Sequence, residues 1–137
     1  MSQQKALLKY KQTSVTSASR EKLLLMMYEG AIKFTKKAIV ACECKDIGER
    51  GLNIGKAYDI IMELNNTLNF EVGGEIAKNL EQLYTFMTDE LTKANVTGQA
   101  AHLHTVLKLL NTLNEAWVKA VDSLKVNKKN EPIGGDK

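Results

Sequence analysis

The chain has 137 residues, of which 44% are hydrophobic and 26% are charged. This size and composition indicate one globular domain and argue against a disordered chain. One proline and nine glycines exclude collagen-like and turn-rich β architectures. The 19 Lys and Arg residues are interspersed with 16 Asp and Glu residues, so no basic stripe forms and we expect no nucleic-acid partner.

The cysteine spacing and the N-terminal composition both bear on the cellular compartment. Cys42 and Cys44 lie too close together in sequence to brace a secreted fold, which favours a reducing environment. Residues 1–14 have no apolar run of the signal-peptide type, and no stretch is long enough to cross a bilayer. We therefore expect a cytoplasmic protein without membrane insertion.

Hydrophobic periodicity divides the chain into an arm, four helices and a tail. Residues 1–18 are polar and aperiodic, which predicts a flexible N-terminal arm or one short helix. Ser19 is an N-cap candidate for a first helix that ends near Cys44. Later helical patterns cover about 50–69, 75–95 and 99–126, and a disordered tail is predicted for 127–137. Because short connections force antiparallel neighbours, the sequence predicts an all-α fold, an up-down-up-down four-helix bundle over 19–126.

The last two helical patterns carry the clearest core stripes. Their boundaries are set by two glycine-containing turns, Gly73-Gly74 and Thr97-Gly98. Apolar residues then recur at helical spacing, which is typical of helices packed in a bundle. The third helix has Ile76, Ala77, Leu80, Leu83, Tyr84, Met87, Leu91 and Ala94, and the fourth has Leu103, Val106, Leu110, Leu113, Trp117, Ala120 and Leu124.

Residues capable of catalysis or metal binding do not form a recognisable site. Cys42 and Cys44, and likewise His102 and His104, are two residues apart, so their side chains diverge on a helix. Metal-binding pairs on helices need a spacing of about four residues. No nucleophile, base and orienting partner occur together. We therefore expect no enzyme activity, no metal and no cofactor.

The first two helices have more apolar surface than a bundle core needs. Beyond their core stripes, apolar flanks widen both helices, and we expect these flanks to form an exposed groove for a partner helix. The groove residues are Leu25, Tyr28, Ile32, Ile54, Tyr58, Ile61 and Met62. Three alternatives remain open: the flanks complete the bundle, they pack under an N-terminal arm whose Leu7, Leu8 and Tyr10 cap the groove, or they form a homodimer interface.

Several short motifs resemble the flagellin-export chaperones, the FliS family. The resemblance is collinear over about residues 8–120 and departs from the family pattern at Arg20, where a proline is common. The motifs are Tyr10-Lys11-Gln12, Ser17-Ala18-Ser19 with Leu23-Leu24, Met26, Tyr28 and Gly30-Ala31, then Gly73-Gly74-Glu75-Ile76-Ala77 with Asn79-Leu80, Leu83-Tyr84, Met87, Leu91 and Ala94-Asn95, and Leu110 to Ala116-Trp117.

The resemblance implies a function as well as a fold. It implies a helical bundle that binds the C-terminal disordered segment of flagellin, prevents premature polymerisation in the cytoplasm and aids delivery to a flagellar type III export-gate component. It also implies that the segment carrying Tyr10 caps a hydrophobic site, and that Tyr58 lies in the binding region. The bound segment would become helical and bury on the chaperone the apolar face that it buries in the filament.

Overall fold

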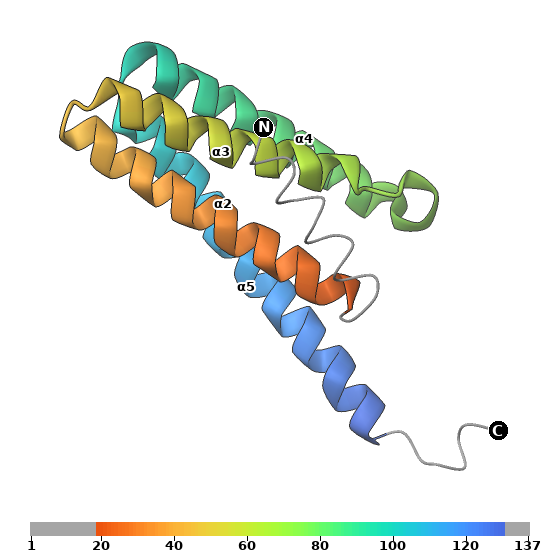
Figure 1. The fold of residues 1–137 in the computed structure, drawn as a ribbon. Coiled ribbons are helices and arrows are strands. Elements are labelled where there is room, and N and C mark those ends of the chain that lie inside the picture. The colour runs from red at the N-terminus through yellow and green to blue at the C-terminus, as the bar shows by residue number, and fades with distance from the viewer. Residues whose placement is uncertain (1–18, 131–137) are drawn as a thin grey trace.

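The computed structural model describes the backbone of residues 19–130 and the side chains of residues 19–123. All regular elements in this part of the chain are helices, α2 (Arg20–Glu43), α3 (Ile47–Asn66), α4 (Phe70–Thr97) and α5 (Ala100–Asn130). Each helix packs against its neighbours in sequence, and α5 closes the square by packing against α2 (Figure 1). The predicted four-helix bundle is thus confirmed.

The two ends of the chain can be compared with the sequence only in part. The arm predicted for residues 1–18 lies outside the described residues. Helix α5 runs to Asn130, past its expected end near Val126, and residues 131–137 are again outside the described part.

Polar side chains cap the first three helices at their N-termini. The Ser19 hydroxyl accepts a hydrogen bond of 3.1 Å from the Lys22 amide, as the sequence predicts. The Asp46 carboxylate likewise accepts from the Glu49 amide at 3.1 Å. Because Asp46 supplies this cap, α3 begins at Ile47, three residues before the expected start.

Two glycines with positive φ determine where the last two helices turn. Gly74 has φ 50° and ψ −120°, which interrupts α4 and separates a first turn from the helix that we expected to begin at Glu75. Gly98 has φ 75° and donates a 2.8 Å hydrogen bond to the Ala94 carbonyl, ending α4 in the left-handed conformation. The expected turn at Gly98 is confirmed.

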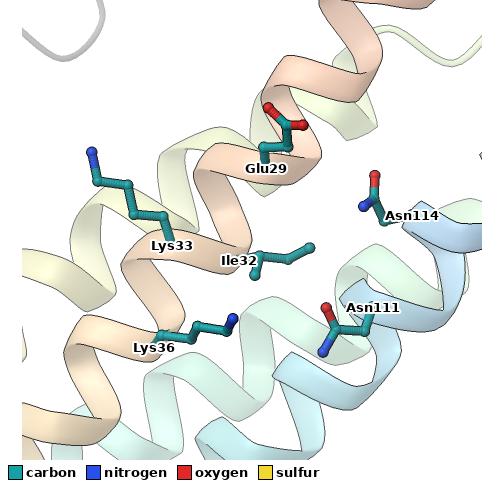
Figure 2. A pocket seen from close by; sticks show the side chains of 6 residues that line it. All are labelled: Glu29, Ile32, Lys33, Lys36, Asn111 and Asn114. Atoms are coloured by element: carbon teal, nitrogen blue, oxygen red, sulfur yellow. The ribbon is translucent and has the colours of Figure 1, made fainter. Parts of the chain in front are cut away.

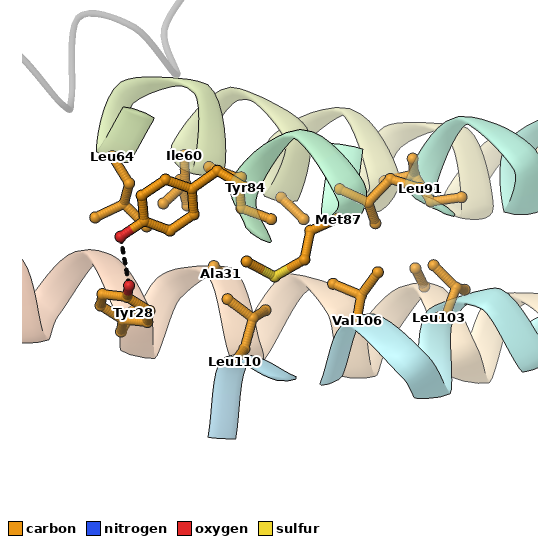
Figure 3. Packing of buried hydrophobic residues seen from close by; sticks show 14 of the residues in the cluster. Tyr28, Ala31, Ile60, Leu64, Tyr84, Met87, Leu91, Leu103, Val106 and Leu110 are labelled. Carbon is orange, nitrogen blue, oxygen red and sulfur yellow. Dashed lines mark hydrogen bonds between the residues drawn. The ribbon is translucent and has the colours of Figure 1, made fainter. Parts of the chain in front are cut away.

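The core lies between a layer formed by α2 and α5 and a layer formed by α3 and α4 (Figure 3). The prediction of a core position is wrong for two residues. Ile76 is 67% exposed just after the break at Gly74. Ala120 is exposed, whereas the next residue, Val121, is buried. The side chain of Leu124 lies outside the described part. The largest apolar side chains that are fully buried are Tyr28, Ile61, Leu64, Met87, Leu91, Leu103, Val106 and Leu110.

One hydrogen bond joins helices that do not pack directly against each other. Helices α2 and α4 lie across the diagonal of the square. The Tyr28 hydroxyl of α2 and the Tyr84 hydroxyl of α4 share a buried hydrogen bond of 2.5 Å (Figure 3). This bond ties the two layers together at one level of the bundle.

The layers diverge toward the end of the bundle where α2 begins. There α2 and α5 run away from α3 and α4 (Figure 1). Side chains near this end, including Leu23, Leu24, Leu113 and Trp117, are only partly buried against the core. The bundle is therefore closed at one end and more open at the other.

Candidate partner-binding surfaces

Three of the seven residues expected to form the groove belong to the core instead. Tyr28 and Ile61 have no exposed surface, and Ile54 is 3% exposed. Tyr28 is turned inward toward α4 by its bond to Tyr84. The expectation that these three residues line an exposed groove is wrong, because the core stripes of α2 and α3 are wider than the helical-wheel estimate allowed.

Leu25 and Ile32 lie on the side of α2 that faces α5. Ile32 lines a cleft with Asn111 and Asn114 of α5, and Leu25 precedes it by two turns on the same face. The opposite side of α2 faces α3, as the approach of Gly30 to Ile60 shows. The structure therefore does not bring Leu25 and Ile32 together with the residues of α3 in one groove.

Tyr58 and Met62 are the groove residues that remain exposed, with 37% and 38% of their surface accessible. They share a face of α3 with Gly51, which packs against Asn95 of α4. Both side chains thus lie along the α3–α4 edge, away from α2. The expected N-terminal cap, Leu7, Leu8 and Tyr10, lies outside the described residues.

An apolar cavity of about 650 Å³ opens at the divergent end of the bundle. Its walls come from α2, from the end of α3 and from α5, and it is hereafter the end cavity. It is lined by Arg20, Glu21, Leu23, Leu24, Met27, Thr67 and Trp117. We expected Trp117 to belong to the core stripe of the last helix. It lines a cavity instead because the layers separate at this end of the bundle.

The tyrosine pair and Trp117 form a buried polar group beside the end cavity. Burial raises the pKa of the Tyr28 and Tyr84 hydroxyls, so both remain protonated at neutral pH. The Trp117 indole is close enough to Tyr28 to oppose that rise, yet its N–H makes no bond of good geometry to a described residue.

A second, polar cleft of about 560 Å³ lies between α2 and α5 and is hereafter the side cleft. It is lined by Glu29, Ile32, Lys33, Lys36, Asn111 and Asn114 (Figure 2). Away from this cleft, on the side of α2 toward α3, the ammonium groups of Lys33, Lys37 and Lys56 lie 5.3, 5.8 and 5.1 Å from the centre of the Phe34 ring. This part of the surface is positively charged.

In the described part of the chain, the two histidines and two cysteines lie in different environments. His102 Nδ1 lies 2.8 Å from the buried Glu90 carboxylate, joining α5 to α4. The His102 bond, with help from Lys93, lowers the pKa of Glu90 despite its burial. His104 and Cys44 are exposed, and Cys42 is partly buried.

Comparison with known proteins identifies the family of this chain. The sequence model described as "Flagellar protein FliS" matches residues 2–124. The chain belongs to the FliS family. The flagellar secretion chaperone FliS of Vibrio cholerae is 38% identical over 112 residues, covering 79% of this chain and 82% of the relative. The FliS of Bacillus subtilis is 34% identical over 114 residues, covering 83% and 84% of the two chains.

A third relative supports the same assignment. FliSB of Pseudomonas aeruginosa, also a flagellar secretion chaperone, is 35% identical over 117 residues and covers 82% of this chain and 93% of its own. These three FliS relatives match 79%, 83% and 82% of this chain, so this chain is a flagellar export chaperone of that family. None of the helices in the described residues is long and apolar enough to span a membrane.

Proposed function

We propose that this protein binds the C-terminal segment of flagellin in the cytoplasm, keeps it from polymerising and aids its delivery to a component of the flagellar type III export gate. The observation that carries the proposal is the end cavity, in which Leu23, Leu24, Met27 and Trp117 offer apolar contacts to a foreign side chain. Membership of a flagellar secretion chaperone family makes a flagellar export substrate the natural occupant.

A long segment would reach more than the end cavity. Tyr58 and Met62 lie on the other side of α3, along its α4 edge. A helical segment of about 40 residues extends about 60 Å at about 1.5 Å per residue. Such a segment can wrap from the cavity to these two side chains, and both types suit an adaptable interface because tyrosine is amphipathic and methionine is flexible.

Calorimetric titration with a peptide covering the last 40 or so residues of the cognate flagellin tests this proposal. Leu24→Glu places a charge at the cavity wall, and Tyr58→Glu places one on the α3–α4 edge. Since burying a large apolar side chain contributes about 1.5–3 kcal/mol, each change is expected to weaken binding at least about tenfold. Circular dichroism checks that the variants remain helical.

Val96→Glu is the matched control, because Val96 is 78% exposed near the far end of α4. It introduces the same charge away from both surfaces and is expected to leave the affinity unchanged. Binding that Leu24→Glu does not weaken would remove the end cavity from the site. Sedimentation of the free protein tests the alternative: a stable dimer that is indifferent to the peptide would favour a homodimerising adaptor.

The N-terminal arm is proposed to act as a competitor for the end cavity. It joins α2 at Ser19, and the next residues, Arg20 and Glu21, line the cavity. Tyr10 is nine residues from Ser19, a stretch that can span about 30 Å when extended. Deleting residues 1–10 is expected to leave the flagellin affinity intact or raise it. A clear loss of affinity would instead place the arm inside the binding site.

A further inference from the structure

The outward side of the α2–α3 pair carries a surface that the flagellin proposal does not use. Residues at helical spacing form one stripe along α2 and another along α3. Because these two helices pack against each other, the stripes lie side by side, and together they are hereafter the outer face. The α2 stripe is Lys33, Lys37 and Val40, and the α3 stripe is Leu52, Lys56, Asp59 and Glu63. None of these residues lines the end cavity.

Three lysines meet around Phe34 in the middle of the outer face. The ammonium groups of Lys33, Lys37 and Lys56 lie 5.3, 5.8 and 5.1 Å from the centre of the half-buried Phe34 ring. The ring attracts each ammonium group, but it carries no net charge that would cancel their mutual repulsion. Among the described residues, no carboxylate lies within ion-pair distance of these three groups. A ligand that places carboxylates among the lysines therefore gains from all of them.

Exposed apolar side chains lie at one end of the outer face. Val40 is 57% exposed and Leu52 is 51% exposed. Helix α2 ends at Glu43 and α3 begins at Ile47, so both side chains lie toward the connection between the two helices. Each stands about one helical turn from a lysine of its own stripe. An occupant that covers this end would bury apolar surface within about a turn of the positive charge.

Carboxylates limit the positive region at the opposite end. Asp59 and Glu63 follow Lys56 by about one and two turns along the α3 stripe. A nucleic-acid strand or an anionic lipid surface carries negative charge over a longer distance, so it would meet these carboxylates as well as the lysines. A compact group of acidic side chains would meet the lysines alone.

We propose that the outer face is a second docking surface, which takes a short amphipathic segment of a protein partner in which apolar residues precede acidic ones. The apolar side chains would cover Val40 and Leu52, and the carboxylates would pair with the lysines around Phe34. This inference does not rest on flagellin binding, because it uses neither the end cavity nor the α3–α4 edge. The chaperone could then hold its export substrate and a second protein at the same time.

The test uses the full chain labelled with 15N and a blocked peptide of about 12 residues, in which two leucines precede three glutamates among alanines and glutamines. In a titration at neutral pH and low ionic strength, we expect saturable shifts in the backbone amides around Lys37, Val40 and Lys56. The same peptide with glutamine in place of glutamate is expected to give none. Shifts confined to other parts of the surface would overturn the proposal.

Paired variants separate a site from general charge attraction. Lys33→Gln combined with Lys37→Gln is expected to weaken binding about fivefold, since each exposed ion pair contributes modestly. Lys78→Gln combined with Lys108→Gln removes the same charge from exposed positions on α4 and α5 and is expected to change the affinity less than about twofold. Equal losses in the two lysine pairs would overturn the proposal.

A second pair of variants tests the apolar end. Val40→Ser is expected to weaken binding about threefold through lost apolar contact, whereas Val96→Ser makes the same change near the end of α4 and is expected to have no effect. Saturating the chain with the flagellin peptide is expected to leave the affinity for the acidic peptide unchanged. Displacement by flagellin, equal effects of the two serine variants, or tighter binding of single-stranded RNA or phosphatidylglycerol vesicles would each refute a separate protein-docking surface.

Discussion

The hydroxyl pair of Tyr28 and Tyr84 is expected to behave as one energetic unit. Replacing either tyrosine by phenylalanine leaves the other hydroxyl buried without its 2.5 Å partner. An unpaired buried hydroxyl costs about 1–3 kcal/mol, so each single variant is expected to lose roughly that much free energy of unfolding. The double variant leaves neither hydroxyl of the pair buried without a partner. Its loss in free energy of unfolding is therefore expected to be clearly smaller than the sum of the two single losses.

Urea unfolding followed by circular dichroism measures these differences. The coupling energy from the four proteins of the cycle is expected to be about 1 kcal/mol or more. Tyr58→Phe is the control, because Tyr58 is exposed and bonds to none of the described residues; its change is expected within about 0.5 kcal/mol. Additive losses from Tyr28→Phe and Tyr84→Phe would show that the bond does not couple the layers and would refute this reasoning.

The same pair predicts how stability changes in alkali. Burial raises the pKa of Tyr28 and Tyr84 in the folded state, so the folded form retains their protons longer than the unfolded form. Their contribution is therefore complete below pH about 10, the ordinary tyrosine pKa, and is lost as the pH rises beyond it. The natural protein is expected to lose stability more steeply above that pH than the double phenylalanine variant.

Two further predictions concern a turn and an ion pair. Gly98→Ala is expected to lower the free energy of unfolding by about 1–2 kcal/mol, because φ is 75° and the new Cβ would lie 2.7 Å from Arg50 Nη1. Gly55→Ala is the control, because the space around Gly55 is open, and it is expected to stabilise α3 by about 0.5–1 kcal/mol. Thermal unfolding measures both changes. The His102 hydrogen bond lowers the pKa of Glu90 below its ordinary 4.5, so its contribution is present above that pH and is lost as the pH falls through the folded value. Acid titration of Glu90→Gln is accordingly expected to show a shallower loss of stability below pH 4.5 than the natural protein, and an equal slope would contradict this.

The fold could be predicted from the sequence because its main determinants are local. The Ser19 cap and the Gly98 turn act within a few residues, and both stand where the sequence places them. The start of α3 was missed because the Asp46 cap outweighs the breaking tendency of Gly48, which lies inside the helix. Local chemistry thus determines the elements, and errors arise where two local signals compete.

The candidate sites could be predicted less well because they depend on how helices splay. A helical wheel shows that Leu25 and Ile32 flank the core, but it does not show whether α3 or α5 lies beside them. Nor does it show that the layers separate near Leu24 and Trp117, which turns core residues into cavity walls. That information resides in long-range packing, and periodicity along one helix cannot supply it.

The order in which the helices pack around the square also affects the folding rate of the chain. Three of the four helix contacts join consecutive helices, and α2 against α5 is the only packing that links distant parts of the described chain. Such low contact order is typical of domains that fold within microseconds to milliseconds. A newly synthesised copy would then complete its bundle as two helical hairpins, α2 with α3 and α4 with α5, that dock together soon after α5 has left the ribosome.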